Sequence, residues 1–320
     1  MPDDVVVRPF RRTDRDQVTE LVNAHVRAVV PNVSVSVSGL LSQLEREPGE
    51  YIVDRWVTER LTLVAEQRER VVAAAHLLRY ADDDRVSAGY RGAGEIRWLV
   101  AWPDTPNWPD AIAAGRLLTA ACVARLARWE VRTCHADGAL PAPGVYGVPE
   151  QWPHVRALYR DAGFSAPAPD EPDAAGVVGG SVETVWLARV DDLPRPAAAP
   201  LPGLTERRSL GACGTRLEAV LDGVRVGYVE VEARDEAPRT QGTRTWADVG
   251  NLHVVPDHRR RGVGTWLLGR AADWLDLGGV TRLLSYTSGD EQSPEAAFHA
   301  ARGFRILTRT VRGWTLTVAP

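Results

Sequence analysis

The sequence predicts an α+β protein made of two successive domains, each with a mixed, mostly antiparallel sheet flanked by helices. Three observations support this prediction. The 320 residues suit about two domains of ordinary size. The segment Asp191–Gly203 is rich in proline, as expected of a semi-rigid linker. The strand and helix signals before this segment are partly repeated after it. We therefore expect domains at residues 1–190 and 204–320, joined by a linker at 191–203.

The first half should open with a strand, because residues 5–12 are rich in β-branched side chains. A helix is expected over residues 13–30, with Thr13 or Asp14 as its cap and apolar residues at helical spacing. A second helix is expected around residues 38–47. The remaining elements are a hairpin at 60–80, a strand at 94–103, a helix at 109–131, a short strand at 132–137, a helix at 151–164 and a closing strand at 182–190.

The second half repeats this order in a shorter form. A strand is expected at 204–209 and a hairpin at 215–233, turning at Asp222 and Gly223. A strand at 246–256 ends in Pro256 and leads to a helix, and a strand at 280–287 and a helix at 293–304 follow. Residues 305–318 supply one or two final strands. A short connection stands where the first half has two helices, so we expect the second domain to lack them.

Composition excludes several classes of protein. Hydrophobic residues make up 44% of the chain and charged residues 25%, which is usual for a globular protein. The net charge of −4 argues against a dedicated nucleic-acid binder, and no run approaches the ~20 apolar residues of a membrane span. The three cysteines form no CxxC pair and, like the histidines, show no zinc-ligand spacing. We therefore expect a cytoplasmic protein with no metal, nucleic-acid partner or membrane partner.

The stretch Asn251–Leu275, NLHVVPDHRRRGVGTWLLGRAADWL, places an arginine- and glycine-rich turn between a strand and a helix. Such a turn directs backbone N–H groups outward at a helix N-terminus, where a phosphate can bind. Gly262 and Gly264 would let the backbone approach a pyrophosphate, and the helix dipole favours its negative charge. Arg259 to Arg261 add positive charge. A dinucleotide-binding interpretation fails, because no GxGxxG opens a βαβ unit.

The segment VVPDHRRRGVGTWLL resembles the acyl-CoA-binding motif of the GNAT superfamily of N-acetyltransferases. Arg259, Gly262 and Gly264 occupy three defining positions of that motif, and the order of elements is similar along nearly the whole chain. The resemblance implies acetyl-CoA as co-substrate, a pyrophosphate held by the turn, and a pantetheine arm paired with the preceding strand. The cofactor-binding residues that it implies are Leu252, Val254, Val255, Arg259, Arg260, Arg261, Gly262, Val263, Gly264, Thr265 and Gln292.

The same resemblance implies direct attack of an amine on the thioester, assisted by a base. Asp248 lies on the strand before the motif, where several family members carry that base. Alternatively, Asp248 caps a turn or forms a salt bridge. Strict alternation would place Asp248, Gly250, Leu252 and Val254 on one face of the strand and His253 on the other. Glu230 and Glu232 on the hairpin are reserve candidates for the base.

The family also needs a group that steadies the leaving thiolate, usually a tyrosine near the end of the last helix. Here that position holds His299, in FHAARGF, whereas the first half has Tyr159, in LYRDAGF. An imidazole titrates near neutrality, so His299 is the candidate acid. The alternative is a histidine on the helix surface, with another residue as the acid.

The first half keeps the residue types expected at the reacting end but lacks the phosphate-binding motif. Glu95 matches Asp248 in its distance from a proline, and Tyr159 is present, but the Arg-x-x-Gly-x-Gly spacing is absent after Pro103. We expect this half to bind acyl-CoA poorly or not at all, and to be structural or to help form the acceptor pocket.

The sequence thus predicts an N-acetyltransferase that moves acetyl from acetyl-CoA to an amine, more readily of a small molecule than of a protein. Two alternatives remain open: a CoA-binding sensor or scaffold without catalysis, and a peptide or protein N-acetyltransferase. The sequence indicates neither the acceptor, nor the acyl chain length, nor the oligomeric state.

Overall fold

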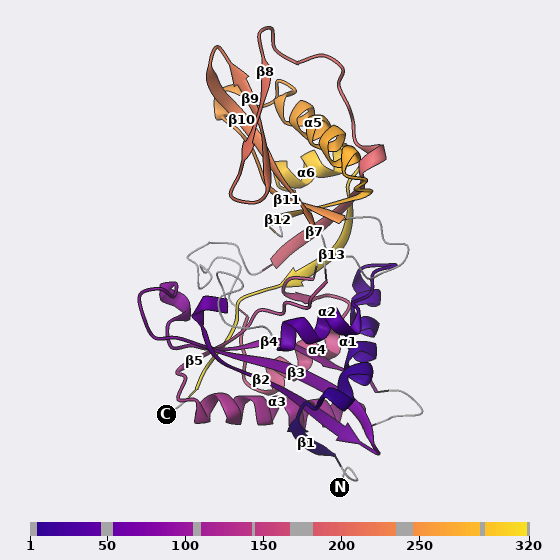
Figure 1. Cartoon of the computed structure of the whole chain (residues 1–320), viewed down its shortest axis with the longest axis vertical. Coiled ribbons are helices and arrows are strands. Elements are labelled where there is room, and N and C mark those ends of the chain that lie inside the picture. The colour runs from indigo at the N-terminus through magenta and orange to yellow at the C-terminus, as the bar shows by residue number, and fades with distance from the viewer. Residues whose placement is uncertain are drawn as a thin grey trace. The chain divides into compact units, whose positions relative to one another are not determined.

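The computed structural model describes residues 5–45, 54–104, 110–142, 145–166, 182–234, 246–288 and 292–318. The chain forms two compact units. The N-terminal unit contains Met1–Glu183 together with Thr308–Pro320, and the C-terminal unit contains Thr184–Leu307 (Figure 1). This division differs from the linear one expected from the sequence, because the end of the chain returns to the N-terminal unit. No helix among the described residues is long and apolar enough to cross a membrane.

The N-terminal unit is built on a six-stranded sheet of order β1-β2-β3-β4-β5-β14. Strands β1 to β4 are antiparallel neighbours, β4 and β5 run parallel, and β14 closes the sheet antiparallel to β5. The strands are β1 (Val6–Pro9), β2 (Val57–Gln67), β3 (Arg70–Tyr80), β4 (Gly94–Ala101), β5 (Thr133–Ala136) and β14 (Trp314–Thr317).

Helices cover this sheet on both faces. The helices are α1 (Arg15–Val29), α2 (Val37–Leu44), α3 (Ala111–Arg128) and α4 (Pro153–Asp161). Helix α3 packs on β2, β3 and β4, whereas α1 packs on β3 and β4 (Figure 1). Strand β3 is buried continuously from Val71 to Leu78, as expected of a strand with helices on both sides.

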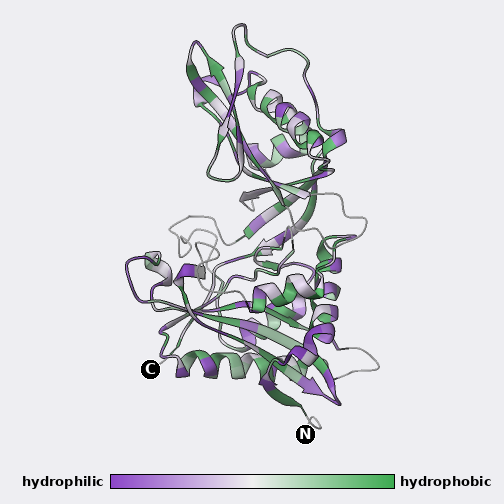
Figure 2. Cartoon of the chain, in the orientation of Figure 1, coloured by the Kyte–Doolittle hydropathy of each residue, from purple (hydrophilic) through white to green (hydrophobic). Residues whose placement is uncertain are grey.

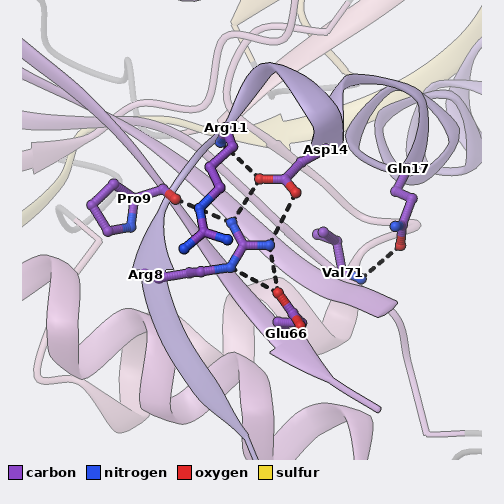
Figure 3. A network of polar contacts seen from close by, with 7 residues as sticks. All are labelled: Arg8, Pro9, Arg11, Asp14, Gln17, Glu66 and Val71. Atoms are coloured by element: carbon purple, nitrogen blue, oxygen red, sulfur yellow. Dashed lines mark hydrogen bonds and ion pairs between the residues drawn. The ribbon is translucent and has the colours of Figure 1, made fainter. Parts of the chain in front are cut away.

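A partly buried arginine, Arg8, ties the first strand to the start of α1. The Arg8 guanidinium donates to both carboxylate oxygens of Asp14, at 2.7 and 2.9 Å, and to Glu66 on β2 at 2.7 Å (Figure 3). The Arg11 amide also donates to Asp14, at 2.7 Å. Burial alone would raise the pKa of Asp14, but the hydrogen bonds from Arg8 and Arg11 outweigh burial and lower this pKa.

Replacing Arg8 with methionine is expected to destabilise the N-terminal unit by about 3 kcal/mol, because Asp14 would stay buried without its partner. The depressed pKa of Asp14 makes its stabilising effect full above its ordinary pKa and lost as pH falls through the folded-state pKa. The difference between wild type and Arg8→Met should therefore shrink in acid. Urea unfolding across pH measures both effects. Arg12→Met, which breaks the exposed Arg12–Glu45 pair, is the control and should change little.

The C-terminal unit is built on a second sheet, of order β13-β7-β12-β11-β10-β9-β8, and the two-residue β6 (Val148–Pro149) pairs with the far end of β13. Strands β8 to β11 are antiparallel neighbours, and β11 runs parallel to β12. The strands are β7 (Val182–Arg189), β8 (Thr205–Leu210), β9 (Thr215–Leu221), β10 (Val224–Arg234), β11 (Trp246–Val254), β12 (Arg282–Ser288) and β13 (Arg305–Val311).

One face of this sheet carries α5 (Val263–Leu277), which packs on β9, β10 and β11. Apolar and polar residues alternate around α5, as expected of a helix with one side buried (Figure 2). Helix α6 (Pro294–Ala301) is capped by Ser293, whose side chain accepts from the Ala296 amide. In the fully described span 205–221, only residues 211–214 connect β8 to β9, so no pair of helices precedes the hairpin as α1 and α2 do in the N-terminal unit.

Two expectations about domain boundaries are corrected. Strand β7 was expected to close the first sheet but lies beside β12, and β14 was expected in the second sheet but pairs with β5. The first sheet therefore receives β14 from the second half of the sequence, and the second sheet receives β7 and the two-residue β6 from the first half. Period-two patterns identify strands but do not say which sheet receives them.

The proline-rich segment, expected to be a semi-rigid linker, packs against the C-terminal unit. Leu193, Leu201 and Leu204 are buried in the core of the C-terminal unit. Arg195 pairs with Asp273 and Asp276 on α5, at 3.2 and 2.8 Å. A Cβ on Gly269 would lie 2.8 Å from the Pro194 carbonyl oxygen, so the absent side chain lets the segment lie against α5. Leu193, Leu201 and Leu204, within and beside the proline-rich segment, are the sequence signal that this segment packs.

Candidate active site

The arginine- and glycine-rich turn forms an uncapped helix start, as the sequence predicts. Gly262 is the N-cap residue of α5, with φ of 84° and no capping side chain, and no acidic residue lies in the first turn. The first backbone hydrogen bond of the helix runs from the Trp266 amide to the Gly262 carbonyl, at 3.0 Å. The N–H groups of Val263, Gly264 and Thr265 precede that bond, so helix geometry leaves them for an external acceptor. This is an anion site by geometry and dipole.

The three arginines of the turn differ in their placement. Arg259 turns back and donates its Nε hydrogen to the Val254 carbonyl at the end of β11, at 2.9 Å. It therefore holds the turn against the strand. Arg260, with φ of 57°, and Arg261 are both exposed, and Arg260 lines the pocket described below.

Strands β11 and β12 separate beside this turn. Their parallel pairing covers Trp246–Asp248 and Arg282–Leu284 and ends with the pair Asp248↔Leu284. Both strands continue, β11 to Val254 and β12 to Ser288. Beyond the last pair, the edge of β11 that faces β12 is open. Open backbone groups along such an edge can pair with an extended ligand as a further strand would.

A β-bulge changes which side chains of β11 share a face. The register with β10 shifts so that Glu230 pairs with Asn251 while Val231 pairs with Val249, which leaves Gly250 as the extra residue. Leu252 and Val254 therefore pack with the α5 core, and Asn251 hydrogen-bonds Glu230 on the opposite face. The prediction that Asp248, Leu252 and Val254 share a face is wrong, because strict alternation does not hold through a bulge.

A pocket of ≈ 760 Å³ joins the uncapped helix start to the point where the strands separate. Its walls come from β11, the turn, the first residues of α5, β12 and α6. Predicted residues in this wall are Leu252, Val254, Arg259, Arg260, Gly262, Gly264, Thr265 and His299. The pocket thus has a cationic, amide-lined end, an open strand edge and a polar end near Ser285 and Tyr286.

Four predicted cofactor residues are placed differently. Val255 donates its amide hydrogen to the Val226 carbonyl, at 3.0 Å, so that amide is engaged within the sheet. The Val263 side chain is buried in the core, which leaves only its amide facing outward. Arg261 and Gln292 are exposed and are not among the residues that line the pocket.

Asp248 lies at the last paired position of β11 and is 6% exposed. The Tyr286 hydroxyl on β12 donates to its Oδ1 at 3.4 Å. Tyr286 lines the pocket, so this hydrogen bond connects the carboxylate to the pocket wall. Asp248 itself is not among the residues that line the pocket and reaches its wall only through Tyr286.

Glu230, the reserve candidate, is engaged on all sides. Its carboxylate accepts from Arg216 Nε at 2.7 Å, from Asn251 Nδ2 at 2.7 Å and from the Ala212 amide at 3.3 Å. Burial would raise the pKa of Glu230, but these donors lower it. Glu230 does not line the pocket. These contacts correct its expected role: Glu230 fixes Asn251 and the 211–214 connection in place, since a saturated carboxylate is a poor proton acceptor.

His299 is buried and lines the pocket, packed among aromatic rings. Its ring stacks on Trp186 with centroids 5.6 Å apart, and meets the Phe304 ring edge-on at 5.1 Å. Nε2 lies 2.8 Å from Ser285 Oγ, and Nδ1 lies 2.7 Å from the Glu295 carbonyl oxygen. Burial lowers the pKa of His299 below its ordinary value, and the Glu295 carbonyl opposes this only in part. His299 is therefore not a surface histidine.

Sequence reasoning missed Ser285, Tyr286 and Asn251. A serine, a tyrosine and an asparagine in strands carry no spacing signal of their own. Their importance follows from where β11 and β12 stop pairing, and that point depends on tertiary structure.

The equivalent region of the N-terminal unit is filled by the unit's own side chains. Glu95 on β4 is 1% exposed, accepts from the Tyr80 hydroxyl and pairs with Arg97 at 3.2 Å. Tyr159 on α4 is 1% exposed, with its ring against Phe164 and Trp314. Burial raises the pKa of Tyr159 well above its ordinary value. Glu95 and Tyr159, the first-half residues that the sequence singled out, are thus both buried in the core of the N-terminal unit. Residues 105–109, where the phosphate motif is missing, lie outside the described part of the chain.

The described residues hold no cluster of histidine, cysteine, aspartate and glutamate that could bind a metal ion. An uncapped helix start, a bulged strand and a separated parallel pair together suit an extended ligand with an anionic end. Residues 183–304 match the model of the Acetyltransferase (GNAT) family. The match begins at β7, in agreement with the placement of that strand in the C-terminal unit.

Solved structures share the fold of the whole chain. A tandem GNAT protein from the clavulanic acid biosynthesis pathway aligns over 99% of both chains with 18% identity and a TM-score of 0.64. A GCN5-related N-acetyltransferase from Sphaerobacter thermophilus aligns over 100% of this chain and 98% of its own, with 14% identity and a TM-score of 0.61. A glucosamine N-acetyltransferase region of a fungal multi-domain β-N-acetylglucosaminidase covers 99% of this chain and 38% of that one, at 14% identity and a TM-score of 0.62. The comparison with curated proteins found no match.

Proposed function

We propose that this protein transfers an acetyl group from acetyl-CoA to the amine of a small molecule, using the pocket of the C-terminal unit. The observation that carries the proposal is that one pocket joins the uncapped start of α5 to the point where β11 and β12 separate. GNAT acetyltransferases use acetyl-CoA as the acetyl donor, and the residues of this pocket suit its two chemically different ends.

The pyrophosphate would bind at the start of α5. The amides of Val263, Gly264 and Thr265 supply donors, the helix dipole supplies positive potential, and Gly262 lets the chain enter the helix in a left-handed conformation. Arg260 adds charge at the rim. Arg259, bonded to the Val254 carbonyl, is proposed to hold the turn in place rather than to contact phosphate.

The pantetheine arm would lie along the open edge of β11. Because the Val255 amide faces β10, alternation directs the backbone groups of Leu252 and the amide of Val254 to the open edge, whereas the Val254 carbonyl accepts from Arg259. From Val254 back to Val249 the strand covers roughly 17 Å at ~3.3 Å per residue. The thioester would then lie where β11 and β12 part, beside the bulge at Gly250.

Asp248 is the proposed base. The acceptor amine would lose a proton to this carboxylate through the Tyr286 hydroxyl, while its nitrogen forms the new bond to the acetyl carbon. The C–S bond then breaks and the electron pair leaves on the sulphur of CoA. Asp248 does not itself line the pocket, so the proton would reach it through Tyr286, which lies in the pocket wall and donates to Asp248.

A small acceptor is favoured by two of the similar structures. One comes from the clavulanic acid biosynthesis pathway, and another is described as a glucosamine N-acetyltransferase region. We extend to the present chain only the class of small, water-soluble amines. The N-terminal unit is proposed to bind no acyl-CoA, because Glu95 and Tyr159 are buried within its core.

The test is release of CoA thiol from acetyl-CoA with two panels of acceptors. One panel contains amino sugars, amino acids and polyamines, and the other contains peptides with free N-termini and lysines. Faster release with members of the first panel alone supports the proposal. Release only with peptides would indicate a protein acetyltransferase, and binding of acetyl-CoA without release from either panel would indicate a sensor.

A further inference from the structure

A buried serine–histidine pair lies at the end of the pocket where the thioester is proposed to bind. Ser285 is 3% exposed and His299 is 7% exposed, and both line the pocket. Ser285 is the first residue of β12 after the last pair with β11. Side chains alternate along β12, so Ser285 faces α6 whereas Tyr286 faces Asp248. The pair is therefore separate from the proposed base.

Hydrogen bonding fixes the tautomer of His299. Nδ1 lies 2.7 Å from the Glu295 carbonyl oxygen, which can only accept, so Nδ1 carries the hydrogen. In the neutral ring, Nε2 must then accept the hydrogen of Ser285 Oγ, 2.8 Å away. The stacked Trp186 ring and the edge-on Phe298 and Phe304 rings hold the imidazole in this orientation. The single N–H of the neutral ring is thus directed away from Ser285.

This arrangement makes the histidine act through the serine. A neutral His299 has no hydrogen on Nε2, and its Nδ1 hydrogen is held by a backbone carbonyl. When His299 carries a second proton, Nε2–H donates to Ser285 Oγ, and the serine hydrogen becomes free to point elsewhere. The serine hydroxyl is then a free donor on the first residue of β12 after its pairing with β11 ends.

We propose that Ser285 donates the proton that neutralises the leaving CoA thiolate, and that His299 resupplies that proton to Ser285. The inference rests on the proposed function, since it assumes that CoA binds in this pocket. As the C–S bond breaks, the sulphur takes the hydrogen of Ser285 Oγ and an S–H bond forms. Oγ takes the Nε2 proton of protonated His299, which leaves a neutral imidazole and an intact serine. His299 regains its proton from solvent before the next turnover. Because burial lowers the pKa of His299, the protonated fraction grows as the pH falls, and the step should become faster in the same direction.

The experiment compares the binding of CoA with that of desulfo-CoA, which lacks the sulphur, by calorimetry on the full chain. A donor to sulphur worth about 1 kcal/mol corresponds to roughly fivefold tighter binding of CoA. Wild type should show this preference, and Ser285→Ala should lose it while binding desulfo-CoA as wild type does. Ser285→Thr keeps the hydroxyl and should retain the preference. Ser209→Ala, exposed on β8 and outside the pocket wall, is the control and should leave the preference unchanged.

An unchanged preference in Ser285→Ala would overturn the inference, because a purely structural serine would not distinguish the two ligands. Recovery of Ser285 as an acetyl ester after incubation with acetyl-CoA would also overturn it, since the hydroxyl would then be a nucleophile. Failure of wild type to bind either ligand would instead refute the proposed function on which the inference rests.

Discussion

Replacing Gly262 with glutamate is expected to weaken acetyl-CoA binding at least ~100-fold, or about 2.7 kcal/mol. Gly262 has a φ of 84°, a conformation that side-chain-bearing residues rarely adopt. A Cβ there would lie 3.0 Å from the Cβ of Pro200. The new carboxylate would also bring negative charge to the helix start that is proposed to hold a pyrophosphate. Calorimetric titration of acetyl-CoA measures the effect.

Two further variants separate charge from backbone strain. Asparagine tolerates the left-handed region, so Gly262→Asn should bind acetyl-CoA better than Gly262→Glu does. Gly223→Glu is the matched control, because Gly223 has a φ of 80° in the β9–β10 turn, is not in the pocket wall, and its Cβ would meet nothing within 4 Å. Gly223→Glu should leave affinity unchanged. Wild-type affinity in Gly262→Glu would place the cofactor elsewhere.

Asp248→Asn is expected to lower kcat by a factor of about 10²–10⁴, the usual range for loss of a general base. Asparagine has nearly the same shape and can still accept from Tyr286, but it cannot take up the amine proton. The affinity for acetyl-CoA should therefore remain that of wild type. Steady-state kinetics with whichever amine the small-acceptor panel identifies, together with calorimetry, separates the two quantities.

Glu232→Gln provides the control for this variant. Glu232 pairs directly across from Asp248 in the β10–β11 register, and it is exposed. Glu232 therefore lies on the same face of the sheet as Asp248 but is not part of the buried site. Its loss should have little effect on kcat. A large decrease in kcat for Glu232→Gln, together with a near-normal kcat for Asp248→Asn, would indicate that Glu232 and not Asp248 is the base.

The parts of the site that were predictable are those set by local sequence. The turn between β11 and α5 combines a proline-ended strand, two spaced glycines and a helical apolar pattern, and each of these acts over a few residues. The α+β class and most elements followed from the same signals. Gly262 with its positive φ is the clearest example, because only a glycine-rich turn makes that helix start easy.

The parts that were not predictable depend on distant segments. The bulge at Gly250 moved Asn251 onto the face of Asp248, and bulges leave little trace in a period-two pattern. The exchange of β7 and β14 between the sheets depends on which edge each strand reaches. Ser285 gains its position only because β11 and β12 stop pairing one residue earlier.

The number of acetyl-CoA sites per chain tests the central claim most directly. Titration of acetyl-CoA into the full-length protein should give one site, and the same titration of Gly262→Glu should give none. This result would place the cofactor in the C-terminal unit and leave the N-terminal unit as a scaffold. Two sites in wild type, or one site that survives the substitution, would contradict the account and turn attention to Glu95 and Tyr159.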